Sequence, residues 1–323
     1  MILILSTRAD RSTFEVAEWL MYYKKEFVIL YDDDVIEINL IDSENFIIQC
    51  GEKIINLNDI TCFWHRTAFH NFNYKILRED IKHEIDISLF KYLHKWTYIE
   101  ERKLYDIFNQ FISKKRYLST SLTYDINRIE VLYKAKELGL DVPDWIISTL
   151  KKEVEDFYKK HLCIITKTIG WNVGFEVENN YLSLYTNIVE KDVIDKLPTT
   201  FTPSFFQKTI KKKYEIRAFY LDGKFYSMAA ISEKSNEEID SRANMMENYY
   251  RKVPYKLPKN IESKLKALLC FYKLKTASID IIKGVDNIFY FLEINPTGQF
   301  NILNVACNYP VEKNIANFLI EKT

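Results

Sequence analysis

The chain has 323 residues and a formal net charge of zero, because 45 acidic side chains balance 45 basic ones. No overall electrostatic field therefore draws it to nucleic acid or to an anionic membrane, and neither partner is expected. Tyr and Phe are abundant, at 22 and 21, whereas Gly and Pro occur only 7 times each. This composition indicates a compact globular protein, and the length indicates two or three subdomains around a shared cleft.

The cysteines and the N-terminus indicate a cytoplasmic protein. The five cysteines are odd in number and show no CxxC spacing, so we expect reduced thiols in the core. The apolar run at residues 1–5 is too short for a signal peptide, and no stretch of the chain approaches the apolar length of a membrane span.

The N-terminal third reads as an α/β domain with a parallel sheet that closes near residue 119. Short apolar runs predict strands at residues 1–5, 27–31, 35–40, 45–55 and 60–66. Ser12 is predicted to cap the helix after the first strand, with Glu15 three residues later. Phe14, Ala17, Leu20 and Met21 are predicted to share its buried face. Residues 77–112 are apolar-periodic without Gly or Pro and predict one or two helices.

The remaining elements alternate between helices and strands. Asp125 is predicted to cap a helix that runs to Leu138 and ends at Gly139. Further strands are expected at 162–167, within 170–195, and at 205–210, 214–221 and 225–231. Asp222 and Gly223 have the composition of a tight hairpin turn. A polar loop at 232–251 and helices at 257–272 and 310–320 complete the prediction.

Two apolar stretches near the C-terminus predict a hairpin that carries oxygen ligands. The first contains Asp280 and the second contains Glu293 and Asn295, and residues 284–287 between them have turn composition. Because side chains alternate along a strand, Glu293 and Asn295 should share one face, with Leu292 and Ile294 on the other. Two carboxylates and an amide suit Mg²⁺ that also binds nucleotide phosphates. The alternative is a set of exposed acids at strand ends, but three together favour a site.

Three cations are open to two interpretations at this point. Lys167 ends an apolar strand, where a lysine either extends to solvent or neutralises phosphate in a nucleotide cleft. Arg217 and Arg242 either pair with nearby acids or bind an oxyanion, for which the planar guanidinium is well suited.

The order of these elements resembles the ATP-grasp superfamily over most of residues 120–300. The resemblance implies a mixed α/β (α+β) ATP-grasp fold, with nucleotide bound between two sheet-containing subdomains. It places an N-terminal pre-ATP-grasp α/β domain at 1–119, a central subdomain at 120–204 and a C-terminal subdomain at 205–323.

The resemblance also implies roles for individual residues. Asp280, Glu293 and Asn295 take the metal positions, and Arg217 and Arg242 lie over the reacting phosphate and acyl group. Contact with the nucleotide is implied for Arg128, Lys167, Gln207, Lys208, Ile210, Glu215, Asn244 and Leu292. Gln207 and the following residues resemble the hinge that reads adenine through its backbone, although Lys208 stands where Glu is commoner.

Within the superfamily, two motifs resemble the graspetide ligases, also called microviridin-type peptide maturases, and especially the grasp-with-spasm subgroup. The motifs are Trp64-His65-Arg66 and the run Phe-Leu-Glu-Ile-Asn-Pro-Thr-Gly-Gln-Phe at 291–300. The sequence departs from the pattern of this family at two positions. Thr67 stands where a second arginine is commoner, and Phe300 stands where tryptophan is commoner.

The resemblance implies an ATP-dependent, ADP-producing macrocyclase that acts on a ribosomally synthesised and post-translationally modified peptide (RiPP). Asp or Glu side chains of a precursor peptide would be phosphorylated and joined to Ser, Thr or Lys side chains as ω-esters or ω-amides. The leader of this peptide would dock in 170–195, where Glu190 and Asp192 either pair a basic leader residue or are solvated turn acids. The sequence does not decide whether the protein forms a homodimer. The rival functions are an ATP-grasp amino-acid ligase and a non-catalytic peptide-binding homologue.

Overall fold

The structure is a computed structural model that describes residues 1–66, 86–120, 126–170, 174–177, 180–183, 186–232 and 250–321. For 174–177, 180–183 and Tyr250 it describes the backbone alone. Three residues with predicted roles, Asp125, Arg242 and Asn244, lie outside the described residues.

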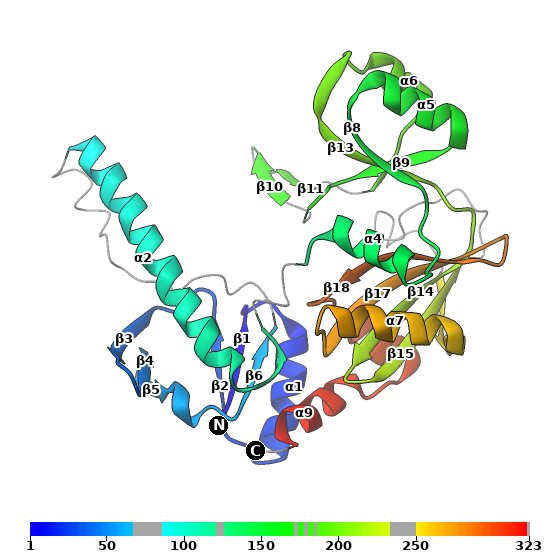
Figure 1. Ribbon diagram of the computed structural model, residues 1–323. Coiled ribbons are helices and arrows are strands. Elements are labelled where there is room, and N and C mark those ends of the chain that lie inside the picture. The colour runs from blue at the N-terminus through cyan, green and yellow to red at the C-terminus, as the bar shows by residue number, and fades with distance from the viewer. Residues whose placement is uncertain are drawn as a thin grey trace.

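The N-terminal domain is built on a four-stranded sheet in the order β2-β1-β6-β7. Its strands are β1 (Ile2–Ser6), β2 (Phe27–Tyr31), β6 (Cys62–His65) and β7 (Arg116–Ser119). All three pairings are parallel, which confirms the predicted α/β opening. The long helix α2 (Ile87–Ser113) projects from this domain at the left of Figure 1.

A small antiparallel sheet flanks the parallel one. It consists of β3 (Ile36–Ile41), β4 (Phe46–Cys50) and β5 (Lys53–Asn56), and the short 3₁₀ helix η1 (Leu57–Asp59) leads from it to β6. Phe46 and Ile48 of β4 pack with Phe63 of β6 and Phe108 of α2 in one core. The second sheet therefore covers the face of the parallel sheet that α2 also covers.

Helix α1 (Arg11–Tyr22) differs from the prediction at its cap and on its buried face. Asp10 is the N-cap, and its side chain accepts a hydrogen bond from the backbone N–H of Ser12 at 2.8 Å. Ser12 lies inside the helix and is buried, because its hydroxyl meets polar groups from the far end of the chain. Phe14 and Met21, predicted to be buried, are 43% and 58% exposed.

The central subdomain contains a four-stranded antiparallel sheet in the order β12-β9-β13-β8. Its strands are β8 (Trp145–Leu150), β9 (Ile164–Lys167), β12 (Asn187–Ile188) and β13 (Thr200–Lys208). Helices α5 (Lys151–His161) and α6 (Lys191–Lys196) cover one face, where Val154, Ile194 and Phe206 pack together. The strands expected within 170–195 include a separate hairpin, β10 (Gly174–Val177) with β11 (Asn180–Ser183).

Two features refine the predicted boundaries. The position 204/205 falls inside β13, which continues to Lys208, so we propose that the C-terminal subdomain begins after that residue. Helix α4 (Arg128–Glu137) is capped by Asn127 rather than by Asp125, because the Asn127 side chain accepts from the N–H of Ile129 at 2.9 Å. Gly139 follows with a φ of +79°, the left-handed conformation expected for a residue that ends a helix.

The C-terminal subdomain is a five-stranded antiparallel sheet in the order β16-β15-β14-β17-β18. The strands are β14 (Lys212–Leu221), β15 (Lys224–Ser232), β16 (Tyr250–Tyr255), β17 (Thr276–Gly284) and β18 (Phe289–Asn295). The predicted turn between β14 and β15 is confirmed, since Asp222 and Gly223 have φ values of +40° and +95°.

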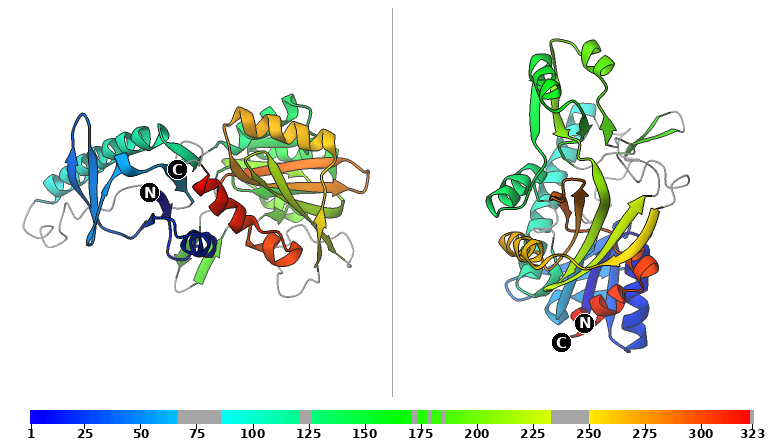
Figure 2. Two further views of the ribbon diagram at one scale, coloured as in Figure 1. Left: turned by 90° about the horizontal axis from the view of Figure 1, so that it is seen from below. Right: turned by 90° about the vertical axis from the view of Figure 1, so that its right-hand side faces the viewer.

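Helices cover both faces of this sheet. Helix α7 (Lys259–Phe271) and α4 pack on one face, against Ile216, Ala218 and Ile279. Helices α8 (Asn301–Cys307) and α9 (Val311–Ile320) lie on the other, against Phe219 and Leu221. The same α9 side chains contact β1 and α1, so α9 lies between the N-terminal domain and the five-stranded sheet, as Figure 2 shows. The second face is covered near Leu221 but carries Arg217 and Glu215 towards its other end.

Candidate active site

The predicted metal hairpin is present, with the expected residues opposite one another. In the antiparallel pairing of β17 with β18, Asp280 lies opposite Glu293, and Ser278 lies opposite Asn295. Residues directly opposite in such a pair have side chains on the same face. Asp280, Glu293 and Asn295 therefore share one face of the sheet, as predicted.

A β-bulge at Leu292 determines which face that is. Ile281 pairs with Phe291 and Asp280 pairs with Glu293, so Leu292 is an extra residue in β18. Phe291 is consequently buried under α4 and α7, although Glu293, two residues later, lies on the opposite face with Asp280. As predicted, Ile294 lies on the other face, in the core under α4 and α7, whereas Leu292 at the bulge is only half-buried. Bulges of this kind re-aim side chains next to active sites.

Each carboxylate of this face is held by a guanidinium. Arg217 lies opposite Asp280 on the neighbouring strand β14, with its Nη1 3.4 Å from Asp280 Oδ1. Arg128, the first residue of α4, places Nη2 3.3 Å from Glu293 Oε2. The four side chains are 21–30% exposed, so solvent and ligands can reach them. Arg217 Nε is buried and donates to no partner among the described residues, so its N–H is available to an anion.

Arg128 also joins this face to the central subdomain. Its Nη1 donates to the backbone carbonyl of Thr168 at 2.8 Å, and Thr168 directly follows Lys167 at the end of β9. Lys167 is half-buried, and its Nζ lies 5.5 Å from the centre of the Phe205 ring. Arg128 of α4 thus contacts both Glu293 of β18 and the residue that follows Lys167 of β9.

The predicted hinge presents alternate side chains to the two faces of the central sheet. Gln207 lies opposite Ile165 and, with Phe205, shares the face of Lys167. It is 1% exposed, and its Nε2 has no hydrogen-bond partner within the described part of the chain. Lys208 lies on the face of Phe206, which packs against α5, so its side chain departs from the Lys167 face. Ile210 is half-buried in the connection from β13 to β14.

Glu215 has a basic partner that the sequence did not reveal. Lys212 Nζ lies 2.6 Å from Glu215 Oε1, and the two side chains are 10% and 26% exposed. Glu215 lies two residues before Arg217 on β14 and so shares its face. Lys212 stands between Lys211 and Lys213, and nothing in that run of lysines marks it as the buried one.

Glu190 and Asp192, predicted to bind a leader peptide, belong to the start of α6. Both are exposed, and Glu190 is the residue before the helix. Asp192 pairs with Lys196 one turn later at 3.1 Å, and this hydrogen bond lowers the pKa of the Asp192 carboxyl. The charge of Asp192 is thus partly neutralised within α6.

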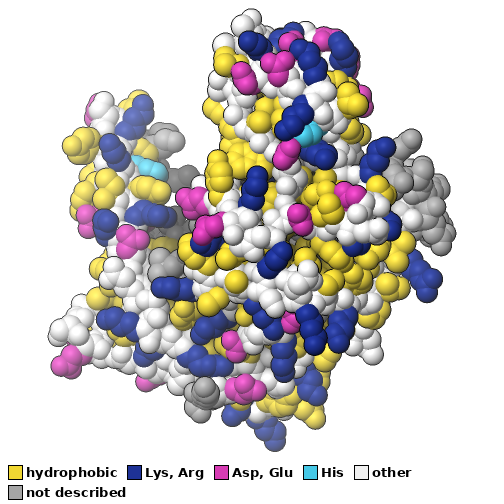
Figure 3. Space-filling view, turned by 45° about the vertical axis from the view of Figure 1, so that its right-hand side comes forward, with side chains coloured by type: hydrophobic (Ala, Val, Ile, Leu, Met, Phe, Trp, Pro, Cys, Tyr) yellow, Lys and Arg dark blue, Asp and Glu magenta, His cyan; other side chains and the backbone are white. Residues whose placement is uncertain are grey.

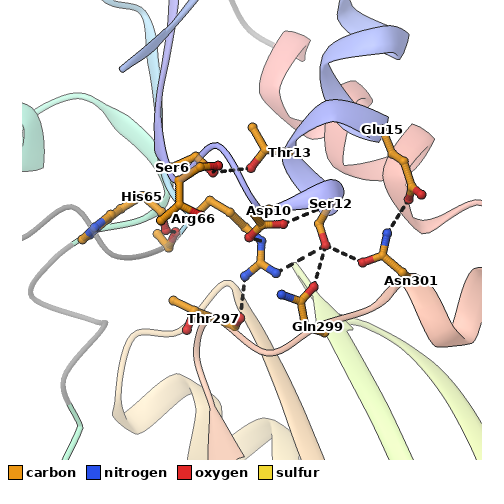
Figure 4. Close-up of polar contacts among 12 residues, drawn as sticks. Ser6, Asp10, Ser12, Thr13, Glu15, His65, Arg66, Thr297, Gln299 and Asn301 are labelled. Carbon is orange, nitrogen blue, oxygen red and sulfur yellow. Dashed lines mark hydrogen bonds and ion pairs between the residues drawn. The ribbon is translucent and has the colours of Figure 1, made fainter. Parts of the chain in front are cut away.

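Sequence reasoning missed a buried polar network between the N-terminal domain and the loop after β18, drawn in Figure 4. Arg66 Nε lies 3.1 Å from Asp10 Oδ2, and both side chains are 3% exposed. Arg66 Nη1 donates to the carbonyl of Thr297 at 2.5 Å. The Ser12 hydroxyl lies 2.7 Å from Gln299 Oε1 and 2.5 Å from Asn301 Oδ1. The sequence marks this network only through parts of two motifs, Trp64-His65-Arg66 and the run at 291–300, and neither motif shows that the two segments meet.

The residues of the sheet face fit Mg²⁺. Asp280, Glu293 and Asn295 offer only oxygen ligands of the hard kind that this ion prefers. No three His, Cys, Asp or Glu residues gather as a metal-binding group within the ranges that the structure describes. Two carboxylates and an amide leave coordination positions for phosphate oxygens and water, which is the usual arrangement for Mg²⁺ at a nucleotide.

Two further observations bear on the class of protein. No described helix is both long enough and apolar enough to cross a membrane. On the face seen in Figure 3, acidic and basic side chains mix in the upper part, and basic side chains gather in the lower part.

Solved structures similar to this one are ATP-grasp ligases. The RiPP-associated ATP-grasp ligase of Chryseobacterium gregarium, in complex with ADP and a leader and core peptide, matches 100% of this chain and 97% of its own, with a TM-score of 0.82 and 25% identity. The macrocyclase MdnC of Microcystis aeruginosa, bound with precursor peptide MdnA, gives a TM-score of 0.79 and 24% identity over 99% of this chain and 100% of its own. The ATP-grasp ligase PsnB, complexed with minimal precursor, Mg and ADP, gives a TM-score of 0.72 and 14% identity over 99% of this chain and 97% of its own. No protein-family model and no curated protein sequence matches the chain.

A carboxylate and guanidinium face between two sheet-containing subdomains, together with these likenesses, defines an ATP-grasp ligase. Such an enzyme is an ATP-dependent carboxylate ligase that releases ADP, and its cofactors are ATP and Mg²⁺, as predicted. More narrowly, the chain resembles the RiPP-associated ATP-grasp ligases, in keeping with the graspetide type that its sequence motifs predict.

Proposed function

We propose that this protein is a peptide macrocyclase that activates side-chain carboxylates of a precursor peptide with ATP. An Asp or Glu carboxylate of the peptide takes the γ-phosphoryl group of ATP, and ADP leaves. A Ser, Thr or Lys side chain then attacks the acyl phosphate, and phosphate leaves as an ω-ester or ω-amide forms. The observation that carries the proposal is the cross-strand pair Asp280 and Glu293 with Arg217 and Arg128 beside it.

The charges of this face suit phosphoryl transfer to a carboxylate. Bound Mg²⁺, held by Asp280, Glu293 and Asn295, would neutralise the nucleotide phosphates. The planar guanidinium of Arg217 can orient two oxygens of an acyl phosphate with its fork of N–H donors. Its contact with Asp280 is long and part-exposed, so an anionic substrate can compete for it. Arg128 and Lys167 lie on the nucleotide side of the cleft.

Catalysis through Arg242 and Asn244, outside the described residues, belongs to the same proposal. Arg242 is assigned to the reacting phosphate and acyl group, and Asn244 to the nucleotide, on the resemblance of their segment to the ATP-grasp pattern. A peptide is the proposed partner because the C. gregarium ligase was solved with a leader and core peptide, and MdnC with the precursor peptide MdnA. We place leader docking in the central subdomain, near β10, β11 and the start of α6.

The product tests the proposal. The enzyme is incubated with ATP, Mg²⁺ and a cognate precursor that contains Ser or Thr and Asp or Glu, and the peptide is analysed by tandem mass spectrometry. We expect one water lost for each bond, located between a hydroxyl and a carboxyl side chain. Ester bonds should reopen under mild alkali, whereas alkali-resistant losses would identify Lys-derived amides. A mass gain equal to an added amino acid would replace this proposal with an amino-acid ligase.

A variant of the metal face tests the assignment of the site. Glu293→Ala should abolish peptide-dependent ADP release, since it removes a predicted metal ligand, while the circular dichroism spectrum stays native. Glu153→Ala, which removes an exposed carboxylate from α5, is the matched control and should turn over like the wild type. Near-native turnover by Glu293→Ala would refute the metal assignment. A wild-type chain that binds the peptide but never turns over ATP would support the non-catalytic alternative.

A further inference from the structure

The buried network at the N-terminal domain contacts the strand that carries the predicted metal ligands. The loop at 296–300 follows β18 directly and is bound from two sides. On one side, Ser278 of β17 donates to the Gln299 carbonyl at 3.2 Å. Gly298 lies so close to this strand that a Cβ built on it would be 2.2 Å from Ser278 Cβ. On the other side, Arg66 donates to the Thr297 carbonyl at 2.5 Å.

Thr297 in turn holds the side chain of Asn295. Its backbone N–H donates to Asn295 Oδ1 at 3.1 Å, and its hydroxyl lies 3.3 Å from the same oxygen. A chain of polar contacts therefore leads from Asp10 through Arg66 and Thr297 to Asn295. Asn295 is the only predicted metal ligand of the three whose oxygen is held by its own loop rather than by an arginine, among the contacts that the described residues make.

We propose that Arg66 is a positioning residue for the metal ligand Asn295. By fixing the Thr297 peptide, whose N–H donates to Asn295 Oδ1, it sets the direction in which that oxygen points. This inference rests on the proposed function, because it takes Asn295 as a ligand of Mg²⁺.

The geometry at position 66 requires an arginine, and another cationic side chain would not replace it. Arg66 uses Nε for Asp10 and Nη1 for Thr297, so two directions of one planar group connect the two partners. A lysine has a single nitrogen at the end of a flexible stem and cannot reproduce this fork. The Phe300 ring lies 5.7 Å from the guanidinium carbon and adds a cation–π contact that restricts the arginine further. Partners that orient metal ligands in this way commonly change metal affinity about 10–100-fold when they are removed.

Metal binding tests the proposal without relying on turnover. Mn²⁺ is titrated into the full chain with a non-hydrolysable ATP analogue, and free Mn²⁺ is measured by electron paramagnetic resonance. Arg66→Met alone leaves the buried Asp10 carboxylate without its guanidinium, so the informative variants are Arg66→Lys and the double variant Asp10→Asn, Arg66→Met. Asp10→Asn keeps an oxygen for the N–H of Ser12 and removes the buried charge. We expect the Mn²⁺ dissociation constant to rise about 10–100-fold in both.

A matched control separates positioning from general loosening of the interface. Glu15→Ala removes the contact of Glu15 Oε2 with Asn301 Nδ2, which lies in the same interface but reaches Arg66 only indirectly, through Asn301 and Ser12. The Mn²⁺ affinity of this control should stay within about twofold of wild type. Only the Arg66 variants should show the large rise in the dissociation constant. Wild-type Mn²⁺ affinity in the double variant would overturn this inference and leave the proposed metal site standing. A loss of affinity in Glu15→Ala as large as that in the Arg66 variants would have the same consequence. A wild-type chain that binds no Mn²⁺ with nucleotide would overturn the proposed metal site as well.

Discussion

Two arginine–carboxylate pairs in this molecule have the same chemistry but opposite surroundings. Arg66 and Asp10 are 3% exposed and lie 3.1 Å apart between the N-terminal domain and the loop after β18. Arg217 and Asp280 are 26% and 30% exposed and lie 3.4 Å apart on the open end of the five-stranded sheet. The first pair is enclosed by protein, whereas the second can exchange its partner for a ligand.

Burial determines how strongly an ion pair affects the stability of the fold. Removing one member of a buried pair leaves a charge that neither water nor protein solvates well, which is strongly destabilising. Removing one member of a part-exposed pair leaves a charge that water solvates, so the effect on stability is small. The enclosed pair should therefore matter for folding, and the open pair for chemistry.

The largest expected effect separates the two aspartates. Asp10→Ala should lower the free energy of unfolding by about 3–5 kcal/mol, because it strands Arg66 and also removes the cap of α1. Asp280→Ala should change it by less than about 1 kcal/mol and yet abolish peptide-dependent ADP release. Urea unfolding followed by circular dichroism measures both. Equal destabilisation by the two substitutions would contradict the comparison.

A smaller effect is expected at the open arginine. Arg217→Ala should slow ring formation by a factor that corresponds to about 2.7–4 kcal/mol, the cost of losing one preorganised contact to transition-state charge. Its affinity for ATP should stay within a few fold, because Arg128 and Lys167 serve the nucleotide. Single-turnover assays and calorimetry give the two quantities. Loss of ATP binding would make Arg217 a nucleotide clamp instead, and the same experiment applies to Arg242→Ala.

The exposed acids of α6 should have a weaker effect. The double variant Glu190→Lys, Asp192→Lys should reduce leader affinity by a few fold and in a salt-sensitive manner, since exposed pairs are worth about 0.2–1 kcal/mol. Asp195→Lys, also on α6, is the control for a general change of charge. Unchanged affinity in calorimetry would remove these acids from the leader site.

The smallest expected effect is a pH dependence of stability in the central subdomain. Burial, with a contribution from Lys160 and Lys208 and opposed by Asp144, lowers the pKa of His161. The unfolded chain therefore binds more protons at this site, and stability should fall as pH drops from about 6.5 through the lowered value. His161→Leu should flatten the melting temperature over that range. A profile as steep as that of the wild type would assign the dependence to other groups.

The metal hairpin was predictable from local patterns, whereas the network at Arg66 was not. Alternating apolar residues and the turn composition at 284–287 indicated the strands of Asp280 and Glu293, and the structure pairs them. The bulge at Leu292 escaped prediction because one extra residue in a strand leaves no mark on composition. The sequence predicts a helix cap at Ser12 and does not reveal its partners Gln299 and Asn301, which lie 287 and 289 positions away. Contacts of that range depend on tertiary packing and have no local signature.

The position of α9 has a consequence for how the chain folds during synthesis. Ile2 and Ile4 of β1 pack in one core with Ile315 and Leu319, so a strand made early and a helix made much later share a buried surface. A nascent N-terminal domain would expose that apolar face until the ribosome has produced α9. We therefore expect residues 1–120 expressed alone to aggregate or to require a chaperone, unlike domains that complete their cores as they emerge.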